Sequence, residues 1–202
     1  MCHRLSITAA PLLLPNPLRP VISFPDRFVA MDVITLGYAV PMIVFNGPAR
    51  AAINARFGFT ALTAPPGVRS ANFTQARAET ISSKPAWTTH LTYRRGLVAV
   101  HAVTERDDAC NLYRYESADG SALLLPTLYR RANGVTEFVL ISTDTPEAFA
   151  ARHPRIPVAL DADAALTWLD LRNPPHVVQA LLSAARPIYR DASAASAVPN
   201  AA

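Results

Sequence analysis

The second residue of the chain is a cysteine, and its position gives it two nucleophilic groups. Removal of Met1 would leave Cys2 with an α-amine and a thiol on adjacent carbon atoms, both partly in nucleophilic form near neutral pH. Such a 1,2-aminothiol condenses with an aldehyde through its amine to a Schiff base, and the thiol then closes a five-membered thiazolidine ring. The thiol can instead attack an amide bond. Cys2 alone therefore leaves both chemistries open, together with the interpretation that a cysteine at this position is accidental.

Two further residues can move protons. Glu105 ends an apolar run over residues 96–104, and His153 follows a predicted helix. A glutamate that ends an apolar strand is partly desolvated, which raises its pKa toward neutrality. A carboxyl group and an imidazole with different pKa values can divide the acid and base steps of a reaction between them. Taken singly, each residue is more commonly a solvated surface or cap residue.

The charge pattern favours an anionic partner. The formal net charge is +4, and Lys84 is the only lysine among 19 basic residues. Arginine presents a planar fork of donors that suits phosphate, although an arginine-rich and alanine-rich chain also results from genomic base composition. Cys2, His3, His101 and His153 lack the paired spacing of zinc frameworks, so we expect no metal and no cofactor.

The bulk composition is that of one globular domain. The chain has 202 residues, of which 50% are hydrophobic and 17% charged, which suits a single buried core. Eighteen prolines interrupt every apolar run before the ~20 residues that a membrane helix needs, and they also break the short apolar patch near the N-terminus. Two cysteines fit a reducing compartment, and we expect Cys110 to be an inert packed thiol. These features predict a cytoplasmic protein without a membrane span.

Alternating and β-branched residues predict mostly strands in the first two thirds of the chain. We expect two strands over 21–38, an inserted loop over 43–72 that contains a short helix at 49–56, and one buried strand over 96–104. The dipeptides Asp119-Gly120 and Asn133-Gly134 are typical of type I′ turns. They predict a three-stranded meander over residues 112–142.

Capping signals predict helices in the last third. Thr145-Pro146 indicates the start of a helix that runs to about residue 152. Asp161 or Asp163 caps a helix over 164–171, and Pro174-Pro175 begins a last helix that runs to about residue 185. Earlier in the chain, Pro85 confines helix within 79–91 to short turns on either side. We expect residues 191–202 to form a disordered tail.

Five short motifs carry a resemblance to a known family. They are Met1-Cys2-x-Arg4, Leu36-Gly37-Tyr38, Gln75-Ala-Arg77-Ala-Glu79-Thr80 with Lys84-Pro85 downstream, Glu105 at the end of its apolar run, and His153-Pro154-Arg155-Ile156-Pro157. In this order they resemble the SOS-response-associated peptidase (SRAP) family over about residues 2–170. The resemblance implies a single α+β domain over residues 1–190, with an antiparallel barrel-like β-sheet and peripheral helices.

The resemblance also implies a function. Members of the family sense abasic sites in single-stranded DNA, cross-link their N-terminal cysteine to the ring-opened sugar aldehyde, and are described as autopeptidases that remove their own Met1. Carried over, Cys2 is the nucleophile, Glu105 the catalytic glutamate and His153 the histidine that assists proton transfer. The positions that hold DNA are Arg4, Gln75, Arg77, Ser142 and Arg155. The implied protein is a cytoplasmic monomer that joins the nucleoid during DNA damage.

Four positions depart from the family pattern, and they keep alternatives open. His3 replaces a glycine, Gln75 an asparagine, Leu36 a tryptophan before Gly37, and Arg106 a tryptophan after the glutamate. Loss of aromatic residues weakens base stacking, which is worth ~1–3 kcal/mol per base. One alternative is therefore a degenerate relative that binds single-stranded DNA without cross-linking. Another is a thiol peptidase that uses Cys2 with His153.

Overall fold

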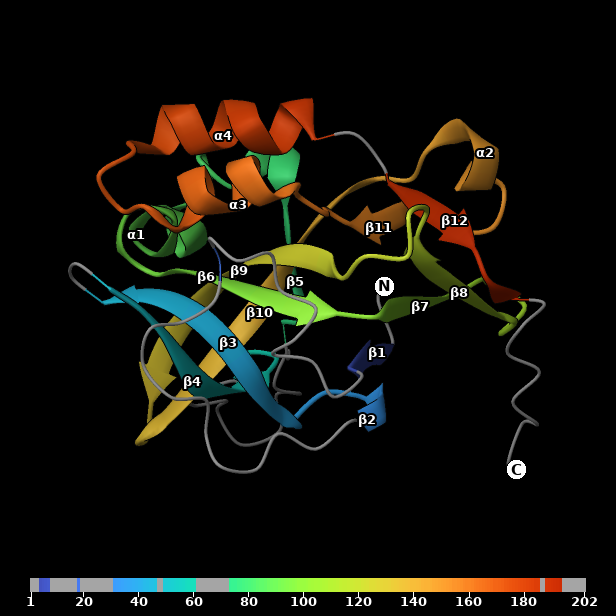
Figure 1. Cartoon of the computed structure of the whole chain (residues 1–202), viewed down its shortest axis with the longest axis horizontal. Helices are drawn as coiled ribbons and strands as arrows, with labels where there is room; N and C mark the ends of the chain where they lie inside the picture. Colours follow the sequence, from blue (N-terminus) through green and yellow to red (C-terminus); the bar gives the residue numbers. More distant parts are fainter. Residues whose placement is uncertain are drawn as a thin grey trace, which may run out of the picture.

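The computed structural model describes residues 4–7, 18, 31–46, 49–60, 73–185 and 188–193. Within these residues the chain forms twelve β-strands and four α-helices. Figure 1 shows strands in the centre, three of the helices gathered over one side, and a smaller group of strands beside them. The observed architecture is thus an α+β fold built around a β-barrel, as the sequence predicted.

Five strands close into the barrel. They are β3 (Ala39–Asn46), β4 (Ala49–Phe57), β6 (Arg95–Val100), β9 (Leu123–Ala132) and β10 (Val135–Asp144). The sheet order runs β10-β4-β3-β6-β9, and β9 pairs again with β10, so the ring of hydrogen-bonded strands is complete. All pairs are antiparallel except β4 with β10, which is parallel.

The barrel corrects one sequence interpretation. Residues 43–46 lie in β3 and residues 49–57 in β4, so the inserted loop expected over 43–72 and its helix at 49–56 are wrong for this part. Residues 47, 48 and 61–72 lie outside the described residues. Ala51, Ala55 and Phe57 alternate into the core, as the period of two of a strand requires.

A second sheet of five strands stands beside the barrel. Its strands are β1 (Arg4–Ile7), β2 (Met31–Ile34), β7 (Ala102–Arg106), β8 (Leu112–Ser117) and β12 (Tyr189–Asp191), in the antiparallel order β12-β8-β7-β1-β2. The single strand expected over 96–104 is divided at His101, where the chain passes from β6 in the barrel to β7 in the second sheet. Of the two strands expected over 21–38, β2 is observed, and residues 21–30 lie outside the described residues.

One of the two predicted hairpins is confirmed. Asn133 and Gly134 adopt positive φ angles of 51° and 77° and connect β9 to β10 in a tight antiparallel pair. The hairpin predicted at Asp119-Gly120 is wrong, because β8 pairs with β7 and β12 whereas β9 belongs to the barrel. A turn dipeptide specifies a local reversal of the chain, but it does not specify which strands pair afterwards.

Helices cover the outer face of the barrel. They are α1 (Pro85–Tyr93), α3 (Ala162–Leu169) and α4 (Pro175–Ala184), and the short α2 (Glu147–Ala150) lies apart from them (Figure 1). Pro85 and Pro175 begin their helices, and the Asp161 side chain accepts a hydrogen bond from the backbone N–H of Ala164 at 2.8 Å. The predicted starts of α3 and α4 are therefore confirmed. The expectation that Pro85 confines helix within 79–91 to short turns is wrong, because a proline is accepted at the first helical position and α1 begins there. The helix predicted over 145–152 is shorter than expected.

Two apolar clusters hold the layers together. One fills the barrel interior and the space against the second sheet, with Met42, Val98, Phe138 and Tyr115 among its members. The other lies between the barrel and the helices, and Trp168 belongs to it. Residues 191–193, expected within the disordered tail, are ordered instead, because Asp191 pairs with β8 and Ala192 is buried; residues 194–202 lie outside the described residues.

Candidate functional site

The last residues of β10 bring two separate motifs to one place. Beyond the barrel, β10 is flanked on one edge by β5 (Gln75–Arg77) and on the other by β11 (Arg155–Pro157). Ser142 is paired with Arg77 on the first side and with Pro157 on the second, and its side chain is buried. The register places Gln75, Arg77, Ser142 and Arg155 on the same face of this sheet.

Arg155 is held by acidic residues of the same chain. Its guanidinium contacts the Glu79 carboxylate at 2.8 Å and the Asp144 carboxylate at 2.7 Å, and it donates to the carbonyl oxygen of Ser142 at 2.6 Å. Burial raises the pKa of Glu79, but the hydrogen bond from Arg155 lowers it, and the net pKa lies below the ordinary value. A phosphate that binds Arg155 must therefore displace a carboxylate. Glu79 belongs to the motif that begins at Gln75, although the sequence assigned it no role.

Gln75 and Arg77 differ in how their side chains are placed. Arg77 is exposed to solvent, as a residue that contacts phosphate requires. Gln75 is half-buried, and its Nε2 atom is buried without a hydrogen-bond partner among the described residues. A buried amide N–H without a partner is costly, so Gln75 is a donor that a ligand can satisfy.

Glu105 is fully buried in β7. It is paired with Tyr113 of β8 and lies on the same face of β7 as the core residue Val103, so its side chain enters the core between the second sheet and the barrel. This agrees with the desolvated glutamate that the sequence predicted. Arg4 of β1 is paired with Thr104, which places its side chain on the opposite face of the sheet from Glu105. Arg4 and Glu105 are therefore close along the sheet but do not face each other.

His153 is buried behind α2, and both of its ring nitrogens have partners. Nε2 lies 2.6 Å from the hydroxyl oxygen of Tyr115, and Nδ1 lies 3.1 Å from the Arg155 carbonyl oxygen and 3.2 Å from Oγ1 of Thr145. Burial lowers the pKa of His153, although the contact with the Arg155 carbonyl opposes this change. The imidazole is therefore neutral at physiological pH.

Tyr115 of β8 joins the two candidate proton carriers, and the sequence gave no signal for it. Its ring makes an edge-on contact with that of His153, with centroids 5.2 Å apart, and packs against Phe149 and Tyr189. Burial raises the pKa of its hydroxyl, Arg152 opposes the rise, and the Glu105 carboxylate adds to it. Glu105 lies on the same face of the second sheet as Tyr115, so Glu105 and His153, which are far apart in the sequence, both lie near this buried tyrosine.

Cys2 and His3 lie outside the described residues. Among the other departures from the motifs, Leu36 and Arg106 are exposed, and Gly37 has a φ angle of 91°, which favours glycine. Cys110, expected to be packed, is exposed, because it lies in the connection between β7 and β8 with a φ angle of 69°. The described residues contain no group of His, Cys, Asp and Glu able to hold a metal ion.

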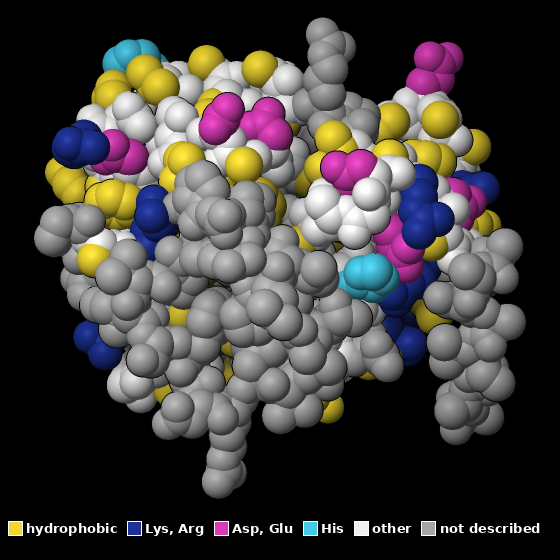
Figure 2. Space-filling model, in the orientation of Figure 1, with side chains coloured by type: hydrophobic (Ala, Val, Ile, Leu, Met, Phe, Trp, Pro, Cys, Tyr) yellow, Lys and Arg dark blue, Asp and Glu magenta, His cyan; other side chains and the backbone are white. Residues whose placement is uncertain are grey.

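The surface over the second sheet carries charges of both signs. Figure 2 shows basic and acidic side chains side by side over β7, β8 and β12. Glu116 contacts Arg190 at 2.6 Å, Arg114 at 2.9 Å and His101 at 3.4 Å. Arg114 and Arg190 on this face therefore share one carboxylate partner within the chain.

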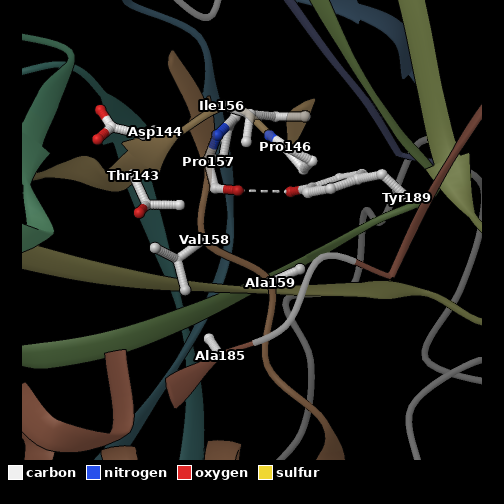
Figure 3. Close-up of a pocket in the computed structure, with 9 residues that line it drawn as sticks. All are labelled: Thr143, Asp144, Pro146, Ile156, Pro157, Val158, Ala159, Ala185 and Tyr189. Carbon is white, nitrogen blue, oxygen red and sulfur yellow. Dashed lines mark hydrogen bonds between the residues drawn. The ribbon is translucent and has the colours of Figure 1, made fainter. Parts of the chain in front are cut away.

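A small apolar pocket lies next to β11. It has a volume of about 170 Å³, and Figure 3 shows Val158, Ala159 and Ala185 around it. At its edge the Tyr189 hydroxyl donates to the carbonyl oxygen of Pro157 at 2.7 Å (Figure 3). The pocket offers van der Waals contact but holds none of the predicted site residues.

Comparison with known proteins defines the class of this fold and site. The model of the family described as "SOS response associated peptidase (SRAP)" matches residues 1–200, so the chain belongs to the SRAP family. This confirms the family predicted from the five motifs, and it supports a role connected with DNA damage and association with DNA. None of the described helices has the length and apolar character needed to cross a membrane.

Solved structures share the fold. A phage-related protein from Bordetella bronchiseptica is 21% identical with a TM-score of 0.69, over 94% of this chain and 93% of that one. A protein from Bacteroides thetaiotaomicron is also 21% identical, with a TM-score of 0.59 over 72% of this chain and 68% of that one. The comparison with curated proteins gave no match.

Proposed function

We propose that this SRAP-family chain captures abasic sites in single-stranded DNA through a thiazolidine link between Cys2 and the ring-opened sugar. The observation that carries the proposal is the burial of Glu105 and His153 in one region: Glu105 lies on the same face of neighbouring strands as Tyr115, and the Tyr115 hydroxyl lies 2.6 Å from Nε2 of His153. The first strand of this sheet begins two residues after Cys2. Two motifs that the family uses for proton transfer thereby lie in the same core.

Covalent geometry limits the distance between the nucleophile and these residues. Two residues span at most about 7 Å of extended chain, so the Cα of Cys2 lies within that distance of the Cα of Arg4. Arg4 is paired with Thr104, the residue before Glu105. The amine and thiol of Cys2 can therefore reach the neighbourhood of the end of β7.

The proposed chemistry needs an acid and a base in turn. The closed sugar hides its aldehyde, and an acid such as Glu105 protonates the ring oxygen as the ring opens. The Cys2 amine attacks the aldehyde carbon, and loss of water from the carbinolamine gives the Schiff base. The thiolate then adds to the C=N carbon, and the nitrogen takes up a proton to complete the thiazolidine. Glu105 is buried, and His153 is neutral, which suits a base.

The polar groups at the end of β10 support a place for the DNA backbone. Arg77 is exposed beside Ser142, and Arg155 becomes available to phosphate when Glu79 or Asp144 releases it. Arginine contacts to phosphate fix the position of a strand without reading its sequence. We propose that Arg4, Gln75, Arg77, Ser142 and Arg155 hold the strand around the lesion.

The test is an adduct that survives denaturation. Purified protein is incubated with a single-stranded oligonucleotide that carries one abasic site, and the products are separated on a denaturing gel. We expect a slower band from wild type and from Cys110→Ala, which removes the exposed thiol, and none from Cys2→Ala. Glu105→Gln and His153→Asn should slow the appearance of the band.

Other outcomes would overturn the proposal. Salt-sensitive binding without a denaturation-resistant band indicates the degenerate DNA-binding relative. An adduct that persists in Cys2→Ala assigns the nucleophile elsewhere. The proposal also includes autopeptidase removal of Met1, a monomeric single domain over residues 1–190, and location in the cytoplasm with recruitment to the nucleoid during DNA damage. Retained Met1 in the mature chain would block the amine and exclude thiazolidine formation.

A further inference from the structure

The contacts of the His153 ring define where its proton lies. The partner of Nδ1 at 3.1 Å is the backbone carbonyl oxygen of Arg155, which can only accept a hydrogen bond. Nδ1 must therefore carry a proton. In a neutral imidazole the other nitrogen then has a lone pair, so Nε2 accepts a hydrogen bond from the Tyr115 hydroxyl at 2.6 Å.

The surroundings of Tyr115 hold its ring in this position. The ring packs against Phe149 of α2 and Tyr189 of β12, and it meets the His153 ring edge-on. The order of donors is then Tyr115 and His153, and it ends on the Arg155 carbonyl.

We infer that Tyr115 is a positioning residue that donates its hydroxyl proton to Nε2 of His153 and holds the neutral imidazole in the tautomer protonated at Nδ1. As a contribution to catalysis, this inference rests on the proposed function. Two elements fix the ring from opposite sides: β8 through Tyr115, and the backbone at the start of β11 through Arg155. The imidazole is thereby held in one tautomer and one orientation before any substrate arrives, and its Nε2 lone pair reaches other groups through the Tyr115 hydroxyl.

Charged groups near His153 and Tyr115 affect the pH at which His153 titrates. Arg152 opposes protonation of His153 and Asp107 favours it, while Glu105 and Asp191 act on Tyr115. A hydroxyl that donates to Nε2 stabilises the neutral imidazole, because the protonated ring has no lone pair to accept the bond. Loss of the Tyr115 hydroxyl should therefore make His153 easier to protonate.

The test compares two tyrosines of the same aromatic cluster. Tyr115→Phe removes the donor to His153. Tyr189→Phe is the matched control, because the Tyr189 ring lies 6.3 Å from that of Tyr115 but its hydroxyl donates to the Pro157 carbonyl. Nitrogen-15 NMR reports the tautomer and titration of His153, whose signals are identified by their loss in His153→Asn.

We expect wild type and Tyr189→Phe to show a proton on Nδ1 and an unprotonated Nε2 that accepts a hydrogen bond. In Tyr115→Phe the titration midpoint of His153 should rise by about one pH unit, the size expected for one hydrogen bond. The pH profile of adduct formation should move in the same direction. Nε2–H in wild type, or an unchanged midpoint in Tyr115→Phe, would overturn the inference. The wild-type tautomer decides the matter if Tyr115→Phe fails to fold, and the NMR result does not depend on whether an adduct forms.

Discussion

At the scale of single residues, burial distinguishes the residues proposed to move protons from those proposed to contact phosphate. Glu105 and His153 are enclosed in the core, whereas Arg77 is exposed. The sequence singled out Glu105 and His153 because each belongs to one of the five motifs, and it predicted desolvation only for Glu105. Tyr115 could not be predicted, because only the pairing of β8 with β7 and the position of α2 bring its hydroxyl to His153. Likewise, nothing in the sequence indicated that carboxylates hold Arg155.

The ion pair between Glu79 and Arg155 gives a prediction for DNA binding. Glu79→Gln should tighten binding of single-stranded DNA by about two- to fivefold at low salt, because a phosphate no longer competes with this carboxylate for Arg155. Glu147→Gln makes the same change of charge at an exposed site of α2 and serves as control. Fluorescence anisotropy at several salt concentrations measures both. Equal tightening in the two variants would mean that net charge alone is responsible.

The depressed pKa of His153 gives a prediction for stability against pH. The folded chain protonates His153 below the ordinary pKa of 6.5, so the unfolded chain binds the proton more strongly between the two values. Stability is full above the unfolded pKa and falls as the pH drops from there through the folded pKa. Urea unfolding at pH 7.5 and pH 5.5 should show a smaller loss for His153→Asn than for wild type. Burial also lowers the pKa of His90, so His153→Asn will still lose part of its free energy of unfolding when the pH falls. An equal loss in both proteins would contradict the burial of a neutral His153.

At the scale of elements, β10 organises the site. Its first half closes the barrel against β4 and β9, and its second half pairs with β5 and β11, which carry two of the motifs. The starts of α3 and α4 and the turn at Asn133-Gly134 were predictable because each depends on a few neighbouring residues. The partners of β10 and β8 were not, since pairing between distant strands depends on the whole chain. The short β5 and β11 contain only three residues each, too few for a periodic pattern.

Arg95 gives a prediction at this scale, because it joins two helices. Its buried guanidinium donates to the carbonyl oxygens of Leu91 in α1 and of Asp170 and Asn173 after α3, and it lies over the ring of Trp168. Burial lowers its pKa to about 10. Arg95→Ala should cost about 2–4 kcal/mol in the free energy of unfolding, measured in urea. Arg94→Ala, at an exposed neighbouring position, should change it by less than about 0.5 kcal/mol. Similar losses in the two variants would contradict the role assigned to Arg95.

At the scale of the whole molecule, the barrel and the second sheet share one core. The chain passes at His101 from β6 in the barrel to β7 in the second sheet. The apolar cluster of the barrel interior continues to Leu5, Val103 and Tyr115 in the second sheet. This continuity brings residues from the beginning, middle and end of the chain to the same region. Membership of the SRAP family and the shared fold of the Bordetella bronchiseptica protein are consistent with this arrangement.

The most direct test of the proposed capture is peptide mass spectrometry of the cross-linked protein. After reaction with an abasic single-stranded oligonucleotide and digestion of both components, the account predicts that the sugar remnant is attached to the N-terminal peptide. That peptide should begin at Cys2, and fragmentation should assign the added mass to its first residue. A remnant on another residue, or a reacted chain that still begins with Met1, would contradict the account.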